Sequence, residues 1–290
     1  MKIYNPIRIR KSQDIVKVLI IYIIFILFCI AILLPVYWLI NSSITTKTEM
    51  FQFPPAYFTS HPVFENYYKL FTTTPFFSYF LHSLVLATVS SIVSVLFSFL
   101  AAYSFARFNF RGSNLIFMIL ILSSALPQML TIIPLFEIFN KLKLVDTNYG
   151  LIILVSSILL PLTIWIMVSF IKQIPFEIEE AALVDGASRI TIIMKIVLPL
   201  ALPVISSMII LNFISIWNEF LYPLIFANSD HTKTLSVLLG EFIYRGSESS
   251  AGKPWDLITA LTSVMVMVPT LMTIFFQRYI LSGLTKGAIK

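Results

Sequence analysis

The chain has 290 residues, of which 58% are hydrophobic and only 12% charged, and its formal net charge is +6. This composition excludes a soluble globular domain, because a soluble domain of this length needs many more polar residues at its surface. A basic excess can indicate nucleic-acid binding, but the sidedness of charge in membrane proteins explains it better, so we expect an all-α integral membrane protein without a nucleic-acid partner.

Six apolar runs are long enough to cross the ~30 Å hydrocarbon core of a bilayer, which requires roughly 20 residues. They cover residues 16–40, 80–103, 115–139, 149–171, 203–226 and 257–276. We expect one six-helix membrane domain over residues 16–278, flanked by the segments 1–15 and 279–290. The first run resembles a signal sequence in having basic residues before it, but its length and the lack of a small-x-small cleavage site after Ile40 indicate that it stays.

The connecting segments carry their positive charge unevenly. If the N-terminus is inside, most of the 20 Lys and Arg residues fall in the inner segments. Because cytoplasmic loops retain positive charge, we predict that both termini are cytoplasmic. The segment 172–202, between the fourth and fifth runs, then lies in the cytosol.

Two of the runs contain residues that affect helix packing or shape. In the second run, small polar residues recur every four positions and share one helix face: Ser90, Ser94 and Ser98. This spacing is typical of close helix packing in lipid, and the lining of a polar pathway is the alternative. In the third run, Pro127 and Pro134 predict a bend, and Gln128 beside it is a candidate residue of a solute path.

The polar segment 172–202 predicts two short helices at an angle. The first should cover about residues 175–185, with glutamates on its positive N-terminal end. Gly186 can adopt a left-handed backbone angle, Ser188 can cap the second helix, and Pro199 should limit that helix. The acidic residues of the first helix are Glu177, Glu179 and Glu180.

The first of these helices should present a low surface, because Ala181 and Ala182 have short side chains. Another protein could approach it closely. A nucleotide site within the chain itself is not expected, since Gly246 and Gly252 are separated by five residues and Pro254 replaces the Ser or Thr that would hold magnesium. Uphill transport driven by ATP would therefore require a separate ATPase subunit.

Polar residues follow one another late in the fifth run, at Trp217, Asn218 and Glu219. Their position near the outer interface favours an aromatic belt with an interfacial carboxylate, and a role in the solute path or outer gate is the alternative. No enzymatic constellation emerges, because the three histidines lie on or near the outer side without a carboxylate at ligand spacing. We therefore expect neither catalytic residues nor a metal site.

The spacing within residues 172–202 is distinctive. The segment contains Glu180-Ala181-Ala182, three further residues, Gly186, nine further residues, and then Ile196-Val197-Leu198-Pro199. This pattern resembles the signature loop of permease subunits of bacterial and archaeal ATP-binding-cassette importers. It occurs here in the expected loop of a six-helix protein.

Other segments narrow the resemblance to the sugar-uptake branch, and to the smaller, second permease of maltose-type transporters. These segments are residues 103–108 with 110–112, 142–147, 217–220 and 277–290. Two positions depart from the family pattern: Lys143 stands where Gly is common, and His82 where Asn is common.

The resemblance implies that the cytosolic loop is a coupling helix that inserts into an ATPase subunit. Glu180 is expected to pair with a basic residue of that subunit. The expected coupling residues are Glu180, Ala181, Ala182, Asp185, Gly186, Ile196, Leu198 and Pro199. The tail resembles a second ATPase contact, with Gly283, Thr285, Gly287 and Lys290.

The resemblance also implies partners and a location. Two related permeases form the path, two copies of an ATPase bind the loops, and an extracytoplasmic binding protein delivers a sugar or oligosaccharide. The ATPases bind ATP and magnesium, so this chain is expected to be a non-catalytic subunit without a cofactor in the lipid of a prokaryotic plasma (inner) membrane. An ion-coupled secondary transporter is the alternative; it would need ionisable residues at mid-membrane, which the runs lack.

Overall fold

The computed structural model describes residues 12–54, 56–248 and 252–285. These residues form α-helices and one π-helical stretch, with no strand among them, which confirms the all-α prediction. They divide into two compact units. Unit 1 holds the chain up to Leu70 together with Pro254–Ser263, and unit 2 holds Phe71–Lys253 together with the chain from Val264 onward.

Five helical segments of the described chain are long and apolar enough to cross a membrane, and a bent pair of helices is a sixth candidate. The bent pair is α5 (Ser113–Ser123) followed by α6 (Gln128–Lys141). The six predicted runs agree with this number if the bent pair is one span. The five segments are α1 (Ser12–Ser43), α4 (Phe76–Arg107), α7 (Asn148–Ile171), the series Arg189–Trp217 and α13 (Trp255–Thr285).

The bend between α5 and α6 measures 103°. Pro127 precedes α6 with ψ near 131°, an extended conformation in which no helix can continue. The predicted bend is thus confirmed at this proline, whereas Pro134 lies inside α6.

The second helix of the polar segment does not end near Pro199. Instead α9 (Arg189–Ile192) continues through the π-helical stretch η1 (Ile193–Val197) into α10 (Leu198–Trp217). The prediction that this proline limits the helix is wrong. Pro199 lies in the first turn of α10, and the carbonyl group with which its ring would clash belongs to a residue of η1, where the wider turn makes room.

The fifth span is therefore displaced toward the N-terminus relative to the predicted run 203–226. It begins at Arg189 and ends at Trp217, and the chain then starts a separate short helix, α11 (Leu221–Phe226). The bounds of that predicted run are wrong at both ends. The other helices outside the polar segment are α2 (Lys47–Met50), α3 (Glu65–Thr73) and α12 (Leu235–Glu248).

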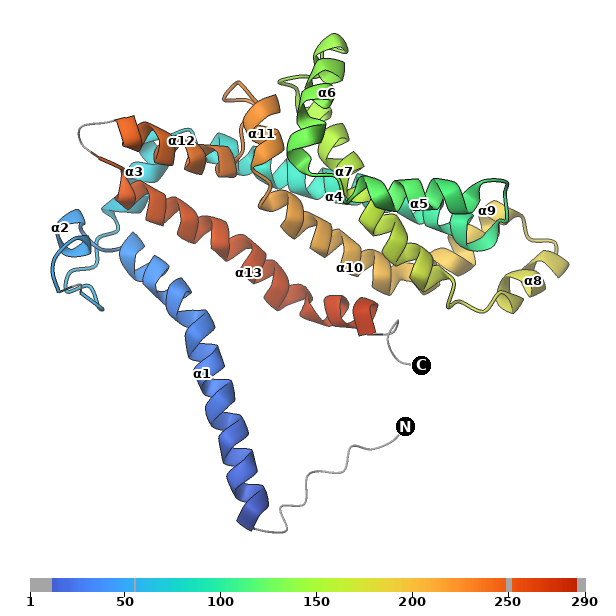
Figure 1. The fold of residues 1–290 in the computed structure, drawn as a ribbon, viewed down its shortest axis with the longest axis horizontal. Coiled ribbons are helices and arrows are strands. Elements are labelled where there is room, and N and C mark those ends of the chain that lie inside the picture. Colours follow the sequence, from blue (N-terminus) through green and yellow to red (C-terminus); the bar gives the residue numbers. More distant parts are fainter. Residues whose placement is uncertain (1–11, 55, 249–251, 286–290) are drawn as a thin grey trace. The chain divides into compact units, whose positions relative to one another are not determined.

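The core of unit 2 is formed by α4, which packs against both α7 and α10 (Figure 1). Ser90, Ser94 and Ser98 are fully buried on α4. The Ser156 hydroxyl of α7 donates to the Ser90 carbonyl at 3.2 Å. The small-residue face therefore serves close helix packing, which confirms the packing interpretation of this spacing.

In unit 1, α1 exposes apolar side chains around its whole circumference, as a helix surrounded by lipid would. Its C-terminal end is held by hydrogen bonds. The Asn66 side-chain amide donates to the Ser43 carbonyl at 2.9 Å, and the Ser43 and Tyr67 hydroxyls are 2.7 Å apart. An ion pair of 3.2 Å joins Lys47 to Asp256.

Candidate functional site

The polar residues at the end of α10 bind the protein's own backbone. Trp217 is buried, stacks on Phe213, and donates its indole N–H to the Met265 carbonyl at 3.0 Å. The Glu219 carboxylate accepts the Leu221 N–H at 3.0 Å, and so caps the start of α11. These two side chains have structural partners, and a role in the solute path remains a prediction for them.

Asn218 and Gln128 lie on exposed positions. The Asn218 amide donates to the Ile214 carbonyl at 2.8 Å, within its own helix. Gln128 is the first residue of α6, and the Thr131 hydroxyl one turn later is 3.3 Å from the Tyr222 hydroxyl of α11. The start of α6 is thus joined to α11.

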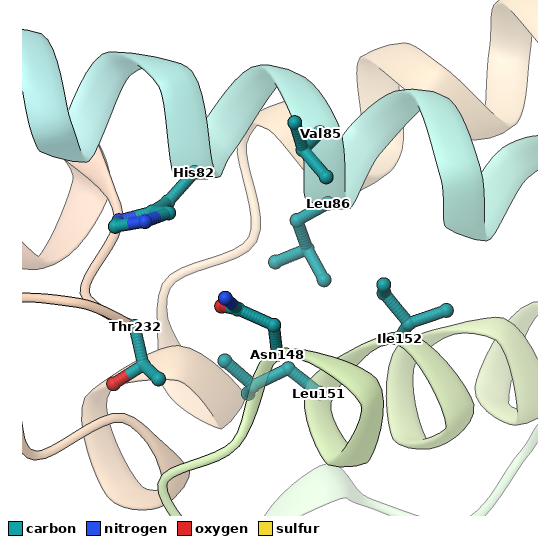
Figure 2. A pocket seen from close by; sticks show the side chains of 7 residues that line it. All are labelled: His82, Val85, Leu86, Asn148, Leu151, Ile152 and Thr232. Carbon is teal, nitrogen blue, oxygen red and sulfur yellow. The ribbon is translucent and has the colours of Figure 1, made fainter.

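A small cavity lies beside His82, between α4, the start of α7 and the loop before α12. Figure 2 shows the His82 ring facing Asn148 and Thr232. The cavity has a volume of about 10 Å³, close to the space that one water molecule needs. Within the described residues the His82 Nδ1 atom has no hydrogen-bond partner, so a water is the ligand that this cavity fits.

Asp146 joins two loops of unit 2. Its carboxylate accepts the backbone N–H groups of Asn228 and Ser229, both at 2.9 Å, and the hydroxyls of Ser229 and Thr232. Its own N–H donates to the Phe226 carbonyl at 2.8 Å. The loop between α6 and α7 is therefore fixed to the loop that follows α11.

The same loop contains residues in the left-handed backbone region that are not glycine, Lys143 with φ 56° and Asp146 with φ 60°. A side chain in this region costs roughly 1 kcal/mol, which a glycine avoids. This geometry explains why Gly is common at the Lys143 position in the family that the sequence resembles.

Burial alone would raise the pKa of Asp146, but the hydrogen bonds from Thr232, Ser229 and Asn228 outweigh burial and hold the pKa below its usual value. A carboxylate with a lowered folded-state pKa stabilises the fold above its ordinary pKa. That contribution is lost as the pH falls through the folded-state pKa.

We predict that Asp146→Asn lowers the free energy of unfolding by about 1.5–3 kcal/mol at pH 7, the range for hydrogen bonds to a charged group. The difference from the parent protein should shrink as the pH falls below the ordinary carboxyl pKa, because the parent carboxylate is then protonated as well. Thermal unfolding in detergent across an acid pH series measures both effects. A difference that is constant with pH would contradict the assignment.

The polar segment after α7 folds largely as its sequence predicts. The helix α8 (Glu177–Val184) agrees with the predicted first helix to within two residues. Gly186 has φ 82°, and the Ser188 hydroxyl accepts the Thr191 N–H at 3.2 Å and so caps α9. The left-handed turn and the cap are both confirmed.

One face of α8 and the turn after it lie open. Val184 is 88% exposed and Ile190 is 74% exposed, a large exposure for aliphatic side chains next to a membrane domain. The expected coupling residues on this open surface are Glu180, Ala181, Asp185 and Gly186. We call the surface formed by these four residues with Val184 and Ile190 the α8 face. Its exposed aliphatic side chains lie among polar residues, as exposed apolar patches at interaction sites do.

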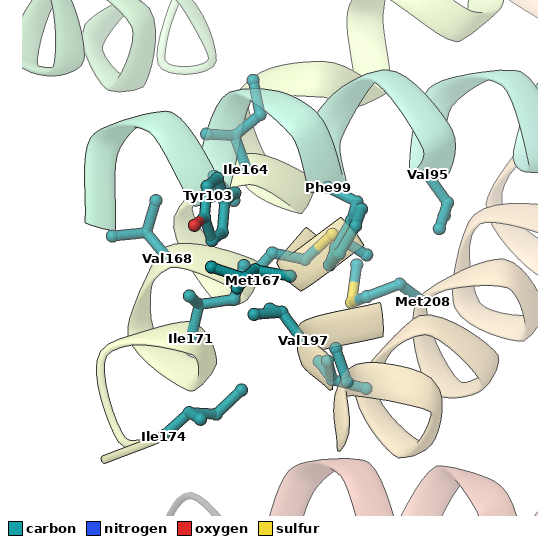
Figure 3. Close-up of a cluster of buried hydrophobic side chains, with 14 residues drawn as sticks. Val95, Phe99, Tyr103, Ile164, Met167, Val168, Ile171, Ile174, Val197 and Met208 are labelled. Carbon is teal, nitrogen blue, oxygen red and sulfur yellow. The ribbon is translucent and has the colours of Figure 1, made fainter. Parts of the chain in front are cut away.

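The remaining predicted coupling residues lie on the side of the segment that packs on the long helices, or at the start of α10. Ala182, Ile196 and Leu198 are half-buried and pack on a hydrophobic cluster, and Pro199 is exposed at the start of α10. Figure 3 shows this cluster, in which side chains of α4, α7, η1 and α10 converge. The α8–α9 segment is thus attached to the ends of the long helices.

Sequence reasoning missed the most unusual side chain of the segment. Glu179 is the one buried residue of α8, with an exposed fraction of 0%. Its Oε1 atom accepts from Arg107 Nε at 2.6 Å, and its Oε2 atom accepts from the Tyr103 hydroxyl at 2.8 Å. Both partners belong to α4. The signal was the pair of Tyr103 and Arg107 four residues apart, which places both on one helix face.

Arg107 makes two further contacts with the chain before α8. Its guanidinium donates to the Ile174 carbonyl at 2.8 Å and lies 5.5 Å from the centre of the Phe176 ring. Arg189, at the start of α9, lies 5.7 Å from the ring of Phe108. The last turn of α4 and the residue that follows it therefore contact the chain on both sides of α8.

The predicted tail contact is only partly within the described chain. Gly283 and Thr285 belong to the last turns of α13, whereas Gly287 and Lys290 lie outside the described residues. Across the part of the chain that the structure describes, no three His, Cys, Asp or Glu side chains are grouped as metal ligands would be.

The chain matches the family model described as binding-protein-dependent transport system inner membrane component over residues 94–286. The trehalose/maltose transport system permease protein MalG of Thermococcus litoralis is 32% identical, covering 96% of this chain and 99% of that one. The sulfoquinovosyl glycerol transport system permease protein SmoH of Agrobacterium fabrum is 33% identical, covering 89% of each chain.

Two solved structures share the fold. A chain of a bacterial ABC transporter involved in the import of the acidic polysaccharide alginate superposes with a TM-score of 0.80, at 19% identity over 95% of this chain and 99% of that one. A chain of the alginate transporter in complex with its pentasaccharide-bound periplasmic protein gives a TM-score of 0.67, at 16% identity over 92% and 97% of the two chains.

Proposed function

The chain belongs to the binding-protein-dependent transport system inner membrane components, as a permease of the sugar ATP-binding-cassette importers, and from this premise we propose the following role. It forms half of the translocation path for a sugar or oligosaccharide, with a second, related permease forming the other half. An extracytoplasmic binding protein delivers the sugar, and two copies of a separate ATPase bind ATP and magnesium. The chain itself carries out no catalytic step.

In this proposal both termini and residues 172–202 lie in the cytosol of a prokaryotic cell, and the membrane domain covers residues 16–278. The excess of Lys and Arg on that side supports this orientation. The α8 face is the coupling surface that inserts into the ATPase. The remaining predicted coupling residues hold the segment against the long helices.

The observation that carries this proposal is the exposure of the α8 face. Val184 is 88% exposed at the end of a helix whose neighbours Glu180 and Ala181 are also exposed. Burial of apolar surface of this kind against a partner is the main favourable contribution to most protein–protein association. Closure of the ATPase dimer would then push on α8 and, through it, on the membrane helices.

Names of relatives suggest the class of substrate. Three of the relatives are named as permeases for trehalose/maltose, for sulfoquinovosyl glycerol and for arabinooligosaccharides. We propose a glycoside or oligosaccharide of comparable chemistry as the substrate. The binding protein, rather than the residues at the end of α10, would then choose much of the substrate.

The proposal predicts that the full-length chain, purified from its native membrane, co-isolates with an ATPase and a second permease. The complex is reconstituted in proteoliposomes together with its binding protein and tested with a panel of mono-, di- and oligosaccharides. It should take up a sugar from this panel only when ATP is supplied on the side of the ATPase subunits. The chain alone should neither hydrolyse ATP nor transport. Uptake by the chain alone, driven by a proton or sodium gradient, would contradict the proposal and favour a secondary transporter.

A further inference from the structure

Helix α8 buries a charge and leaves its other residues exposed or half-buried. Of its eight residues, Glu179 alone is buried. Acidic side chains are almost never fully buried unless they are paired, because removing an isolated carboxylate from water costs several kcal/mol. The attachment of α8 to the rest of unit 2 therefore depends on what holds this carboxylate.

Both oxygens of Glu179 are held by α4. Oε1 accepts from Arg107 Nε at 2.6 Å and Oε2 accepts from the Tyr103 hydroxyl at 2.8 Å. The Arg107 side chain is 6% exposed, so solvent and salt screen this ion pair very little. Two donors one turn apart on α4 thus fix one carboxylate of α8.

Arg107 also fixes the chain that leads into α8. It donates to the Ile174 carbonyl at 2.8 Å, and its guanidinium lies over the Phe176 ring. Its charge-assisted hydrogen bonds have defined directions, whereas apolar contacts are non-directional and permit sliding. The half-buried side chains of Ala182 and Leu183 supply only such apolar contacts.

We propose that the Arg107–Glu179 ion pair, together with Tyr103, is the positioning element that carries displacement of α8 into α4. This inference rests on the proposed coupling role of α8. Because α4 packs along both α7 and α10, a displacement of its last turn also moves the helices that form the core of unit 2. The α8 face receives the ATPase, and the ion pair passes the motion on.

Two variants separate this role from simple stabilisation. Glu179→Gln leaves Arg107 buried without its counter-charge, which should lower thermal stability as well as coupling. The double variant Arg107→Met with Glu179→Leu replaces the ion pair by apolar groups, a change that often preserves stability. Glu177→Gln makes the same chemical change as the first variant at an exposed position of the same helix, and serves as the matched control.

The measurement is made on the complete complex, with Cys29→Ser and a bimane label on Leu100→Cys. Leu100 is an exposed residue of α4, so its label reports the environment of that helix. ATP and vanadate are added, and the change in bimane emission is recorded. The amount of ATPase that co-isolates with the chain and the amount of vanadate that it traps are measured on the same sample. No sugar needs to be known for this experiment.

The parent complex and the Glu177→Gln control should show the full change in emission. The apolar double variant should retain and trap its ATPase at the parent level, yet it should lose most of the emission change that the parent shows. A full change in the double variant would overturn the inference, and so would a parent label that does not respond. A parent chain that co-isolates no ATPase would instead contradict the proposed function.

Discussion

Glu180→Lys is expected to remove ATPase binding while leaving the membrane domain folded. Glu180 lies exposed on α8, where surface substitutions usually change the free energy of unfolding by no more than about 0.5 kcal/mol. In the proposed complex, however, the lysine would face the basic ATPase residue that the family resemblance implies as the partner of Glu180. Such like-charge contacts in an interface cost several kcal/mol.

The amount of ATPase that co-isolates with the variant should therefore fall at least tenfold, which corresponds to about 1.4 kcal/mol. Thermal unfolding in detergent should match the parent protein. Glu177→Lys is the matched control, since it reverses an exposed charge on the same helix outside the α8 face. Equal loss in the two variants would show that the helix responds only to its overall charge, and normal ATPase recovery with Glu180→Lys would reject the assigned face.

Gly150→Ala is expected to cause a larger loss of stability than the same methyl addition at Gly240. A Cβ atom on Gly150 would overlap the Leu144 carbonyl oxygen and lie 2.7 Å from the Thr147 hydroxyl. That hydroxyl caps α7 by accepting the Gly150 N–H at 3.1 Å. The obstacle is backbone, so the start of α7 would have to move and lose its cap, at a cost of about 3 kcal/mol or more.

The measurement is thermal unfolding of the purified protein in detergent. Gly240→Ala is the control, because its added Cβ would meet the edge of the Phe220 ring at 2.7 Å, and a side chain can rotate away. The Gly150 variant should therefore unfold at a clearly lower temperature than the Gly240 variant. Equal unfolding temperatures would mean that the loop before α7 yields easily, contrary to the structure.

Local sequence signals predicted the polar segment well. The start of α8, the left-handed Gly186 and the Ser188 cap each depend on residues a few positions apart, so the sequence contains all that determines them. The bend at Pro127 is likewise determined by a local residue, the proline itself. The prediction that Pro199 limits the second helix failed because the π-helical stretch before it accommodates the ring.

Contacts between distant residues could not be predicted in this way. The negative charge of Glu179 fits the N-terminal end of α8 equally well as a surface residue, and its partner Arg107 lies 72 positions earlier in the chain. Only the packing of α8 on the end of α4 turns this carboxylate into a buried ion pair. Trp217 and Glu219 were ambiguous in the same way, since a polar residue near the membrane interface can face a solute or bind a backbone group. In the structure the side chain of each residue binds a backbone group.

Cross-linking from α8 tests the central claim most directly. A photo-reactive amino acid at Ala181, an exposed position of the α8 face, is introduced into the full-length chain and illuminated in native membranes. The same amino acid at exposed Lys141, on the predicted outer side, is the control. We expect the Ala181 position to give a cross-link whose peptide map identifies an ATP-binding-cassette ATPase, and the Lys141 position to give none to that subunit. Cross-links from Ala181 to lipid alone, or to the ATPase equally from both positions, would contradict the coupling role of this helix.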